Sequence, residues 1–282
     1  MSEMLAELAK VNEVLTQHGI NHAEESITRL YHALAENPEA NQAESGMCNA
    51  CVFFLQQINS DTSSLAVTEL TQREGRVEYA MSLTQFIVSL LDARYEDEEV
   101  IKTCLDEALT VLDALGHEVA VNAAEDPESL QEADWYHGMN IAETASVMAD
   151  IYTTTLNDDA QELAARCLEV KILSSIAGQY PHIVAPSVIN VSSCFAKTGQ
   201  AEQALYGYYA VIKDFAWIVG EFKEGDVLTP EESMALEALK VACERYVGSV
   251  EEDAFEILEQ ATETLEKTDL ILSTAEQVSN EE

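Results

Sequence analysis

The sequence predicts an all-α protein, and three observations lead to that expectation. Apolar residues recur at intervals of three and four along most of the chain, which places them on one face of a helix. Residue combinations that cap helix starts occur repeatedly, among them the segment 229–232 (TPEE) and Asp126 before Pro127. Stretches with the period of two that half-buried strands show are short and few. The starts correspond to about twelve helices of roughly 12 to 25 residues joined by short turns.

The clearest helical pattern is a predicted hairpin at residues 188–219. Two apolar stripes with helical spacing flank the turn Thr198-Gly199-Gln200, and Gly199 stands where a helix ends in a left-handed residue. We therefore expect two antiparallel helices that bury these stripes against the rest of the protein. The first stripe comprises Val188, Val191, Ser192 and Phe195, and the second comprises Leu205, Tyr208, Tyr209, Ile212, Phe215, Ala216 and Val219.

This hairpin resembles one unit of a tetratricopeptide (TPR) repeat, in which two antiparallel helices touch through small residues and large side chains fill the gaps. Ser192 and Ala204 stand at the small positions, Phe195 and Tyr208 at the large ones, and Gly199 at the turn. The match covers one unit of about 34 residues. The resemblance implies a TPR-like α-α superhelix, a right-handed stack of antiparallel helix pairs.

Two earlier segments carry fainter versions of the same unit. In the first, Leu30 and Ala33 occupy the large and small positions, and Pro38 begins the next helix. In the second, at residues 95–109, Ile101 replaces the expected small residue. The spacing between the three units is irregular, so the expected fold is TPR-like with insertions.

Residues 117–127 are the predicted loop between two helical halves. Helical periodicity stops there, and Gly116, Asn122 and Asp126-Pro127 favour a loop. The prediction assigns 1–116 to an N-terminal TPR-like half and 128–275 to a C-terminal TPR-like half that ends in a capping helix. A second loop is expected at 220–229, and residues 276–282 are expected to be a frayed tail.

The charge of the chain is its strongest compositional feature. Its 14 Lys and Arg against 52 Asp and Glu give a formal net charge of −38, and 47% of its residues are hydrophobic, enough for a substantial core. Such a charge attracts basic partners and disfavours nucleic acid and anionic lipid, whose binding depends on Lys and Arg. Solubility alone, or a saline habitat, would also select an acidic surface, so these interpretations stay open beside partner binding.

The location expected from the sequence is cytoplasmic. The sequence contains no apolar run long enough to span a membrane and no basic-then-apolar signal at its start. Its six cysteines do not suggest a disulfide scaffold. Four of them lie alone on apolar helix faces and are expected to be reduced core residues: Cys104, Cys167, Cys194 and Cys243.

The last helix, predicted at residues 250–275, has an apolar and an acidic face. A solvated outer face of a terminal cap and a docking surface for a basic partner both explain the acidic one. The stripe expected to face inward comprises Phe255, Leu258, Ala261, Leu265 and Leu272. The acidic stripe, at intervals of four, three, four and three, comprises Glu252, Glu256, Glu259, Glu263 and Glu266.

Three short motifs are candidates for a catalytic or metal site. Cys48 and Cys51 would supply half a zinc site, but no second pair follows, and the apolar residues after them favour burial. The acidic segment 158–162 resembles the magnesium motif of helical terpenoid enzymes, although carboxylates there would also cap a helix. Asp134 and His137 are one copy of a spacing that a di-iron bundle needs twice. The prediction is therefore no catalytic residue, no metal and no cofactor.

The TPR resemblance implies a concave groove lined by the first helix of each unit. Apolar side chains there suit an amphipathic helix or extended peptide, although packing under neighbouring units would also explain them. Asn190 and Lys197 are of the types with which such repeats grip a terminal carboxylate, but further basic residues are missing. The implied positions are Val11, Leu15 and His18 in the first unit, Phe86, Leu90 and Arg94 in the second, and Ile189, Asn190, Ser193, Ala196 and Lys197 in the third.

The expected function is that of a non-enzymatic scaffold that binds a basic protein or peptide, as a chaperone, a toxin-neutralising partner or a regulatory adaptor. Neither nucleic acid nor a membrane is an expected partner. One alternative is a nucleic-acid mimic that occupies the basic cleft of a DNA-binding protein. The acidic stripe alone offers one charge per about 5 Å, against about 1.7 Å in duplex DNA, so mimicry would need several acidic helices side by side. A helical enzyme with an acidic metal site is a third alternative.

Overall fold

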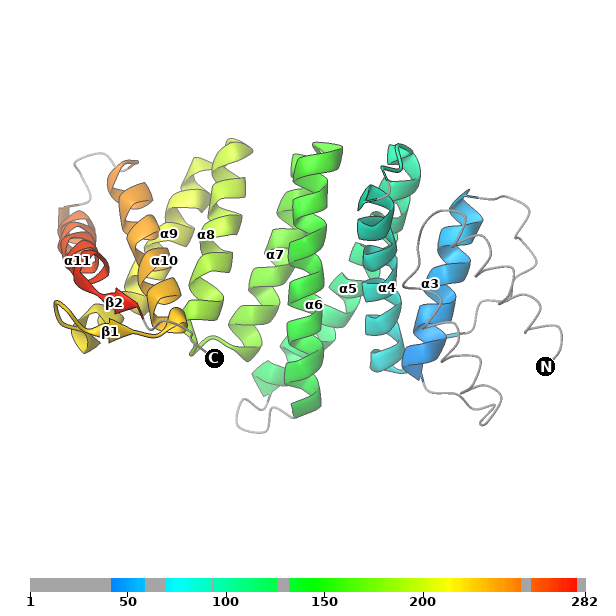
Figure 1. Ribbon diagram of the computed structural model, residues 1–282, viewed down its shortest axis with the longest axis horizontal. Coiled ribbons are helices and arrows are strands. Elements are labelled where there is room, and N and C mark those ends of the chain that lie inside the picture. The colour runs from blue at the N-terminus through cyan, green and yellow to red at the C-terminus, as the bar shows by residue number, and fades with distance from the viewer. Residues whose placement is uncertain (1–41, 59–68, 93, 126–131, 250–254, 278–282) are drawn as a thin grey trace. The chain divides into compact units, whose positions relative to one another are not determined.

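The computed structural model describes residues 42–58, 69–92, 94–125, 132–249 and 255–277 (Figure 1). This part of the chain is predominantly helical, and its only strands are β1 (Val227–Leu228) and β2 (Glu276–Gln277). The predicted all-α class is therefore confirmed. The chain divides into two compact units, Met1–Asn157 and Asp158–Glu282.

In the first unit each described helix packs against the next one and the next but one. Thus α4 contacts α3, α5 and α6, while α5 also contacts α3 and α6. A Cβ atom added to Gly46 would lie 2.1 Å from the carbonyl oxygen of Gly75, so α3 and α4 approach closely there. The elements are α3 (Gln42–Ile58), α4 (Arg73–Asp92), α5 (Glu98–Glu125), α6 (Glu132–Ile151) and the π-helical turn η3 (Tyr152–Leu156) that continues α6.

Two arginines of α4 tie it to the helices that follow. The Arg76 guanidinium donates to both carboxylate oxygens of Glu118, at 3.0 and 3.1 Å, and Arg73 pairs with Asp134. These contacts join α4 to α5 and to α6. The Tyr152 hydroxyl donates to Asp106 at 2.8 Å and links η3 back to α5.

The loop predicted at 117–127 is wrong for residues 117–125, which are the last turns of α5. Val119 and Ala123 are buried and continue the helical stripe that begins at Leu112 and Leu115. Gly116 is buried within the helix, where its weak helix propensity is outweighed by packing. The boundary between the units instead follows Asn157, whose left-handed φ of 49° ends η3. Residues 126 and 127 lie outside the described residues.

In the second unit each helix packs against the next one, and α8 also packs against α10. Helix α8 contacts α7, α9 and α10, and α10 also contacts α9 and α11. The elements are α7 (Asp159–Ile176), α8 (Pro181–Lys197), α9 (Ala201–Phe215), the 3-10 helix η4 (Ala216–Glu221), α10 (Pro230–Val247) and α11 (Phe255–Thr274). The capping box predicted for residues 229–232 is confirmed, because the Thr229 and Glu232 side chains each accept from the other's backbone N–H.

The connection between η4 and α10 is held against the end of α11. The Gly225 N–H donates to the Thr274 hydroxyl at 3.1 Å, and β1 pairs in parallel with β2, with Val227 opposite Glu276. Of the loop predicted at 220–229, residues 220–221 belong to η4 and 227–228 form β1, while the remaining residues are loop. The frayed tail predicted at 276–282 is wrong for residues 276–277, while 278–282 lie outside the described residues.

The predicted hairpin is α8 and α9, and its turn has the predicted geometry. Gly199 has a φ of 80°, the Gln200 N–H donates to the Phe195 carbonyl at 2.8 Å, and the Gly199 N–H donates to the Ala196 carbonyl at 3.1 Å. This pair of bonds is the Schellman motif, which satisfies the last carbonyls of a helix. Gly199 therefore ends α8 and reverses the chain.

Helices α8 and α9 approach each other closely at Ser192 and Gly207. A Cβ atom added to Gly207 would lie 2.0 Å from the Ser192 Oγ and 3.2 Å from its Cβ. The Ser192 hydroxyl is buried and donates to its own helix, at the Val188 carbonyl, 2.6 Å away. The predicted small residues Ser192 and Ala204 and the large residue Tyr208 are all buried. The packing of α9 on α8 thus depends on a residue without a side chain at position 207.

In α11 the buried stripe is rotated from the predicted one. Ala261 is buried as predicted, but Leu258, Leu265 and Leu272 are only half-buried. Two threonines are buried instead, and the Thr268 hydroxyl donates to the Thr264 carbonyl at 2.7 Å, which satisfies it within the helix. The side chain of Phe255 lies outside the described residues. The full buried stripe comprises Ala261, Thr264, Thr268 and Ile271.

We predict that Gly207→Ala lowers the free energy of unfolding by about 1–2 kcal/mol, because overpacking against Ser192 exceeds the better helix propensity of alanine. The double variant Ser192→Ala with Gly207→Ala recovers part of this loss, since it removes the nearest atom. Gly220→Ala is the matched control, because a Cβ atom there meets nothing within 4 Å. Urea unfolding followed by circular dichroism measures all three, and equal stabilities of the two single variants would contradict the close contact.

Candidate binding groove

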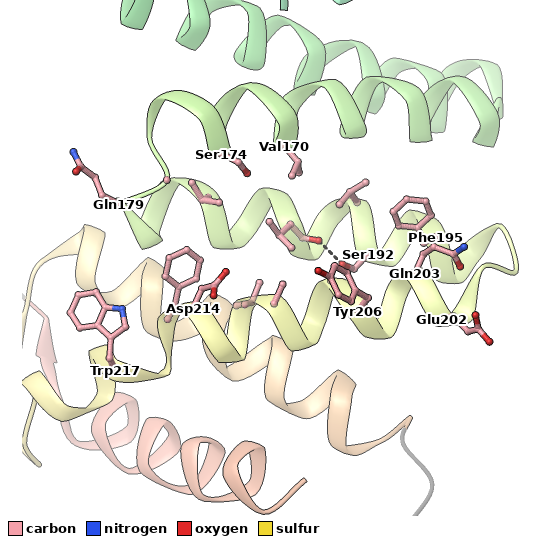
Figure 2. Close-up of a pocket in the computed structure, with 18 residues that line it drawn as sticks. Val170, Ser174, Gln179, Ser192, Phe195, Glu202, Gln203, Tyr206, Asp214 and Trp217 are labelled. Carbon is pink, nitrogen blue, oxygen red and sulfur yellow. Dashed lines mark hydrogen bonds between the residues drawn. The ribbon is translucent and has the colours of Figure 1, made fainter. Parts of the chain in front are cut away.

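A cavity of about 1020 Å³ opens in the second unit between α7, α8, α9 and η4, and its lining is mostly apolar (Figure 2). We call it the α7–α9 groove. In Figure 2, Gln179 and Trp217 lie at one end and Phe195, Gln203 and Glu202 at the other. The lining residues are Val170, Ser174, Gly178, Gln179, Val184, Val188, Val191, Ser192, Phe195, Glu202, Gln203, Tyr206, Gly207, Ala210, Val211, Asp214, Phe215 and Trp217.

One face of α8 forms the floor of the groove. Its lining residues Val184, Val188, Val191 and Phe195 follow each other at intervals of four, three and four, which aligns them along a single stripe. Val184 and Val191 are buried, while Val188 and Phe195 are half-buried and face the opening. The floor is therefore a continuous apolar surface.

The α9 wall combines small residues with exposed aromatic ones. In the middle of this wall, Gly207 and Ala210 have no or small side chains, so the wall projects little into the groove there. Tyr206 is 73% exposed and Trp217 is 60% exposed, although both carry large apolar rings. Exposed Tyr and Trp beside an apolar cavity are the residue types that most often carry binding energy at protein interfaces.

All the charge in the lining of the groove is negative. Glu202 and Asp214 are its two charged side chains among the described residues, and both are exposed. They stand on the same helix at opposite ends of the groove, about 18 Å apart at 1.5 Å per residue. The groove therefore offers an apolar floor between two carboxylates.

The groove positions predicted from the TPR resemblance lie on the other side of α8. Ile189, Asn190 and Ser193 are about 100–200° around the helix from Val188. Ile189 is buried, whereas Asn190, Ser193 and Ala196 are exposed. Val11, Leu15 and His18 lie outside the described residues.

Lys197 is engaged within the protein. Its ammonium lies 2.9 Å from Glu162 and 2.5 Å from Asp159, and hydrogen bonds to both carboxylates raise its pKa, Asp159 contributing most. Lys197 therefore links α8 to α7 in this structure.

The predicted groove residues of the first unit belong mostly to its core. Phe86 and Leu90 are buried, and the Phe86 ring lies 5.8 Å from that of Phe54. Arg94 is exposed and has a left-handed φ of 59° just after α4. Phe86 and Leu90 thus agree with the alternative that these side chains pack under neighbouring units.

The acidic stripe of α11 is exposed where it is described. Glu259, Glu263 and Glu266 face solvent, and Lys267 lies 3.9 Å from Glu263. Glu252 and the side chain of Glu256 lie outside the described residues. The exposure fits both the solvated-face and docking-surface interpretations.

Helices α7 and α8 are joined by buried charges. Glu162, Arg166 and Glu169 on α7 are each less than 10% exposed. The Arg166 guanidinium donates to Glu169 at 3.0 Å, and the Ser187 hydroxyl of α8 donates to the other Glu169 oxygen at 2.8 Å. We call the contacts of Glu162, Arg166 and Glu169 with α8 the α7–α8 seam. The seam lies beside the groove floor and holds α7 in place as the wall opposite α9.

The buried thiols are held in their protonated form. Burial, a hydrogen bond to Glu162 and the charge of Glu162 raise the pKa of Cys194 to about 12. Burial also raises the pKa of Cys104 and of Cys243 to about 12. Cys194 therefore donates to Glu162, at 3.3 Å, as a neutral group. Cys167, predicted to be a core residue, is instead exposed.

The two aspartates among the candidate metal ligands have structural partners. Asp158 caps α7 by accepting from the Gln161 N–H at 3.2 Å, and Asp134 pairs with Arg73. Burial and the neighbouring Arg73 lower the pKa of His137. Within the described ranges no three His, Cys, Asp or Glu side chains gather closely enough to hold a metal ion. Cys51 is buried, and the Cys48 side chain lies outside those ranges.

Sequence reasoning did not single out Gly207, Tyr206 or Trp217. A signal was present, because Tyr206 and Trp217 are large aromatic residues that lie off the stripe predicted to be buried, which runs through Leu205, Tyr208 and Tyr209. An apolar residue off the buried face of an amphipathic helix marks an exposed contact surface.

No protein family, curated protein or solved structure matches this chain. None of the helices in the described part of the chain combines the length and hydropathy needed to cross a membrane.

We predict that Arg166→Met lowers the free energy of unfolding by about 3–5 kcal/mol, because it leaves the Glu169 carboxylate buried without its cationic partner, with the Ser187 hydroxyl as its remaining donor. The double variant Arg166→Met with Glu169→Met regains most of that loss. Lys240→Met is the control, since Lys240 pairs with Asp269 at 2.6 Å on the surface and such pairs contribute under about 1 kcal/mol. Chemical denaturation measures the three, and a loss in Arg166→Met no larger than in the control would contradict the proposed role of the seam.

Proposed function

We propose that this protein is a non-enzymatic, TPR-like binding scaffold that engages a basic segment of another protein in the α7–α9 groove. The observation that carries the proposal is the groove itself. It offers an apolar floor, two exposed aromatic side chains and, as its only charges among the described residues, the carboxylates of Glu202 and Asp214.

The packing of the helices supports the TPR-like part of the proposal. The α8–α9 hairpin has a small residue at each predicted contact and a left-handed glycine at its turn. Within each unit, consecutive α-helices contact each other, and three pairs of alternate helices also do so, as stacked helix pairs do: α3 with α5, α4 with α6 and α8 with α10. A surface built in this way presents extended grooves rather than a closed pocket.

The charge of the chain supports a basic partner. A net charge of −38 accelerates encounter with cationic surfaces and repels anionic ones. Apolar contact in the groove would then supply the affinity, because rim charges contribute more to encounter rate than to binding strength. The negative charge is thus proposed to attract the partner, and the apolar floor and the aromatic side chains are proposed to bind it.

The non-enzymatic part of the proposal is supported by the engagement of the candidate reactive groups. Asp158, Asp134 and Lys197 make structural contacts, and the Cys194 thiol stays protonated. A binding role as a chaperone, toxin-neutralising partner or adaptor requires none of these groups to react.

The proposal predicts a basic protein that is captured from a lysate of the source cells and stays bound above about 0.3 M salt, where the Debye length is below about 8 Å. Capture is lost in Trp217→Ala, because that side chain borders the groove. Trp135→Ala is the matched control, since Trp135 is 39% exposed on α6 in the other unit. Salt-gradient elution with mass spectrometry measures retention.

Two results would overturn the proposal. One is a diffuse set of basic proteins that all elute at low salt, which would make the acidity a trait of solubility or habitat. The other is equal retention of a basic protein by wild type and by Trp217→Ala, which would place its binding outside the groove.

A further inference from the structure

We infer that the α7–α9 groove takes an amphipathic α-helix of the partner, with its apolar face on α8 and a Lys or Arg toward each end. The inference rests on the proposed function and specifies the conformation and the charge spacing of the bound segment. Four features of the groove lead to it: its length, the polar groups it lacks, its low middle and the positions of its carboxylates.

The groove has the length of a short helix. Its floor runs from Val184 to Phe195, about 17 Å along α8 at 1.5 Å per residue. The opposite wall runs from Gln203 through Ala210 of α9 to Trp217 of η4. A partner helix of three turns, about 16 Å long, fills this distance.

Few groups in the groove are able to pair with an extended backbone. The backbone N–H and C=O groups of α8 and α9 bond within their own helices. Ser192 already donates to the Val188 carbonyl, which leaves the uncharged polar groups of Ser174, Gln179, Gln203 and the Tyr206 hydroxyl. An extended peptide would bury unpaired N–H and C=O groups on the valine floor, whereas a helix satisfies its own.

The low middle of the α9 wall makes room for a helix. Gly207 and Ala210 project little from α9, and the distance between packed helices falls when the residues at the contact are small. Trp217 at one end and Phe195 at the other bracket this low stretch (Figure 2). A helix laid there would pack beside α9 much as α9 packs on α8.

The carboxylates fix the orientation of charge on the bound helix. Glu202 and Asp214 are separated by about 18 Å along the axis of α9 and by about 120° around it, and both line the groove. Two basic residues eleven positions apart on a helix lie on one face and about 17 Å apart, which matches this separation. The partner segment is therefore an apolar helical stripe bordered by two cations.

Trp217 provides a direct readout. The chain has two tryptophans, Trp135 and Trp217, so Trp135→Phe leaves Trp217 as the sole indole reporter. Titration of this full-length variant would use synthetic 18-residue peptides with a leucine stripe. The first carries two lysines eleven positions apart, the second carries glutamates in their place, and the third carries the lysines with two central prolines that prevent a helix.

The first peptide is expected to shift the Trp217 emission to the blue at micromolar concentration. The glutamate and proline peptides each bind about ten-fold more weakly or worse, because one meets two like charges and the other cannot form a helix. Replacing Glu202 and Asp214 together by Gln and Asn lowers the affinity for the first peptide by about three- to ten-fold. Glu259→Gln with Glu263→Gln on α11 is the matched control and leaves its affinity unchanged.

Equal affinity for the lysine and glutamate peptides would overturn the charge assignment, and equal affinity for the proline peptide would overturn the helix. The absence of any Trp217 shift with all three peptides would overturn the inference as a whole. Capture of a basic protein by the same Trp135→Phe variant distinguishes failure of this inference from failure of the proposed function. If capture persists without a peptide shift, the inference fails and the proposed function stands; if both are lost, the proposed function fails as well.

Discussion

The close contact between Ser192 and Gly207 is the constraint on which the rest of the second unit depends. Because a Cβ atom at position 207 would meet the Ser192 side chain, α9 lies nearer to α8 than two helices with ordinary side chains would. The same glycine lowers the α9 wall, so the contact that binds the hairpin together also leaves the groove open beside it. A single small residue thus connects the stability of the hairpin with the surface proposed to bind a partner.

The α7 wall of the groove, opposite α9, is held by polar rather than apolar contacts. Arg166, Glu169 and Ser187 bond across the α7–α8 interface, and Glu162 accepts from both Lys197 and Cys194. Buried charges of this kind contribute little net stability, but a shift of one helix along the other would leave several of them unpaired. The seam therefore fixes how α7 is placed along α8. It also uses two cationic residues of a chain that has only 14, which leaves the rim of the groove negative.

Local rules predicted the hairpin well, and non-local packing explains where prediction failed. Gly199, Ser192 and the capping box at Thr229 depend on residues near in sequence, and all were predicted. The turns of α5 at 117–125 were predicted as loop because Gly116 outweighed a buried stripe that only packing reveals. In α11 the buried face was missed because Thr264 and Thr268 count as polar until their hydroxyls bond within the helix. The α7–α9 groove is a different surface from the expected concave groove at Ile189, Asn190 and Ser193. Local rules do not predict it, since the positions of α7 and α9 around α8 are set by tertiary contacts.

The measurement that tests the central claim most directly is amide hydrogen exchange of the full chain, with and without the captured basic partner. If the partner occupies the α7–α9 groove, slowed exchange on binding is confined to α7, α8, α9 and η4, while α11 and the first unit exchange as before. Slowed exchange centred on the acidic stripe of α11, or on the helices of the first unit, would contradict the claim and assign recognition to another surface.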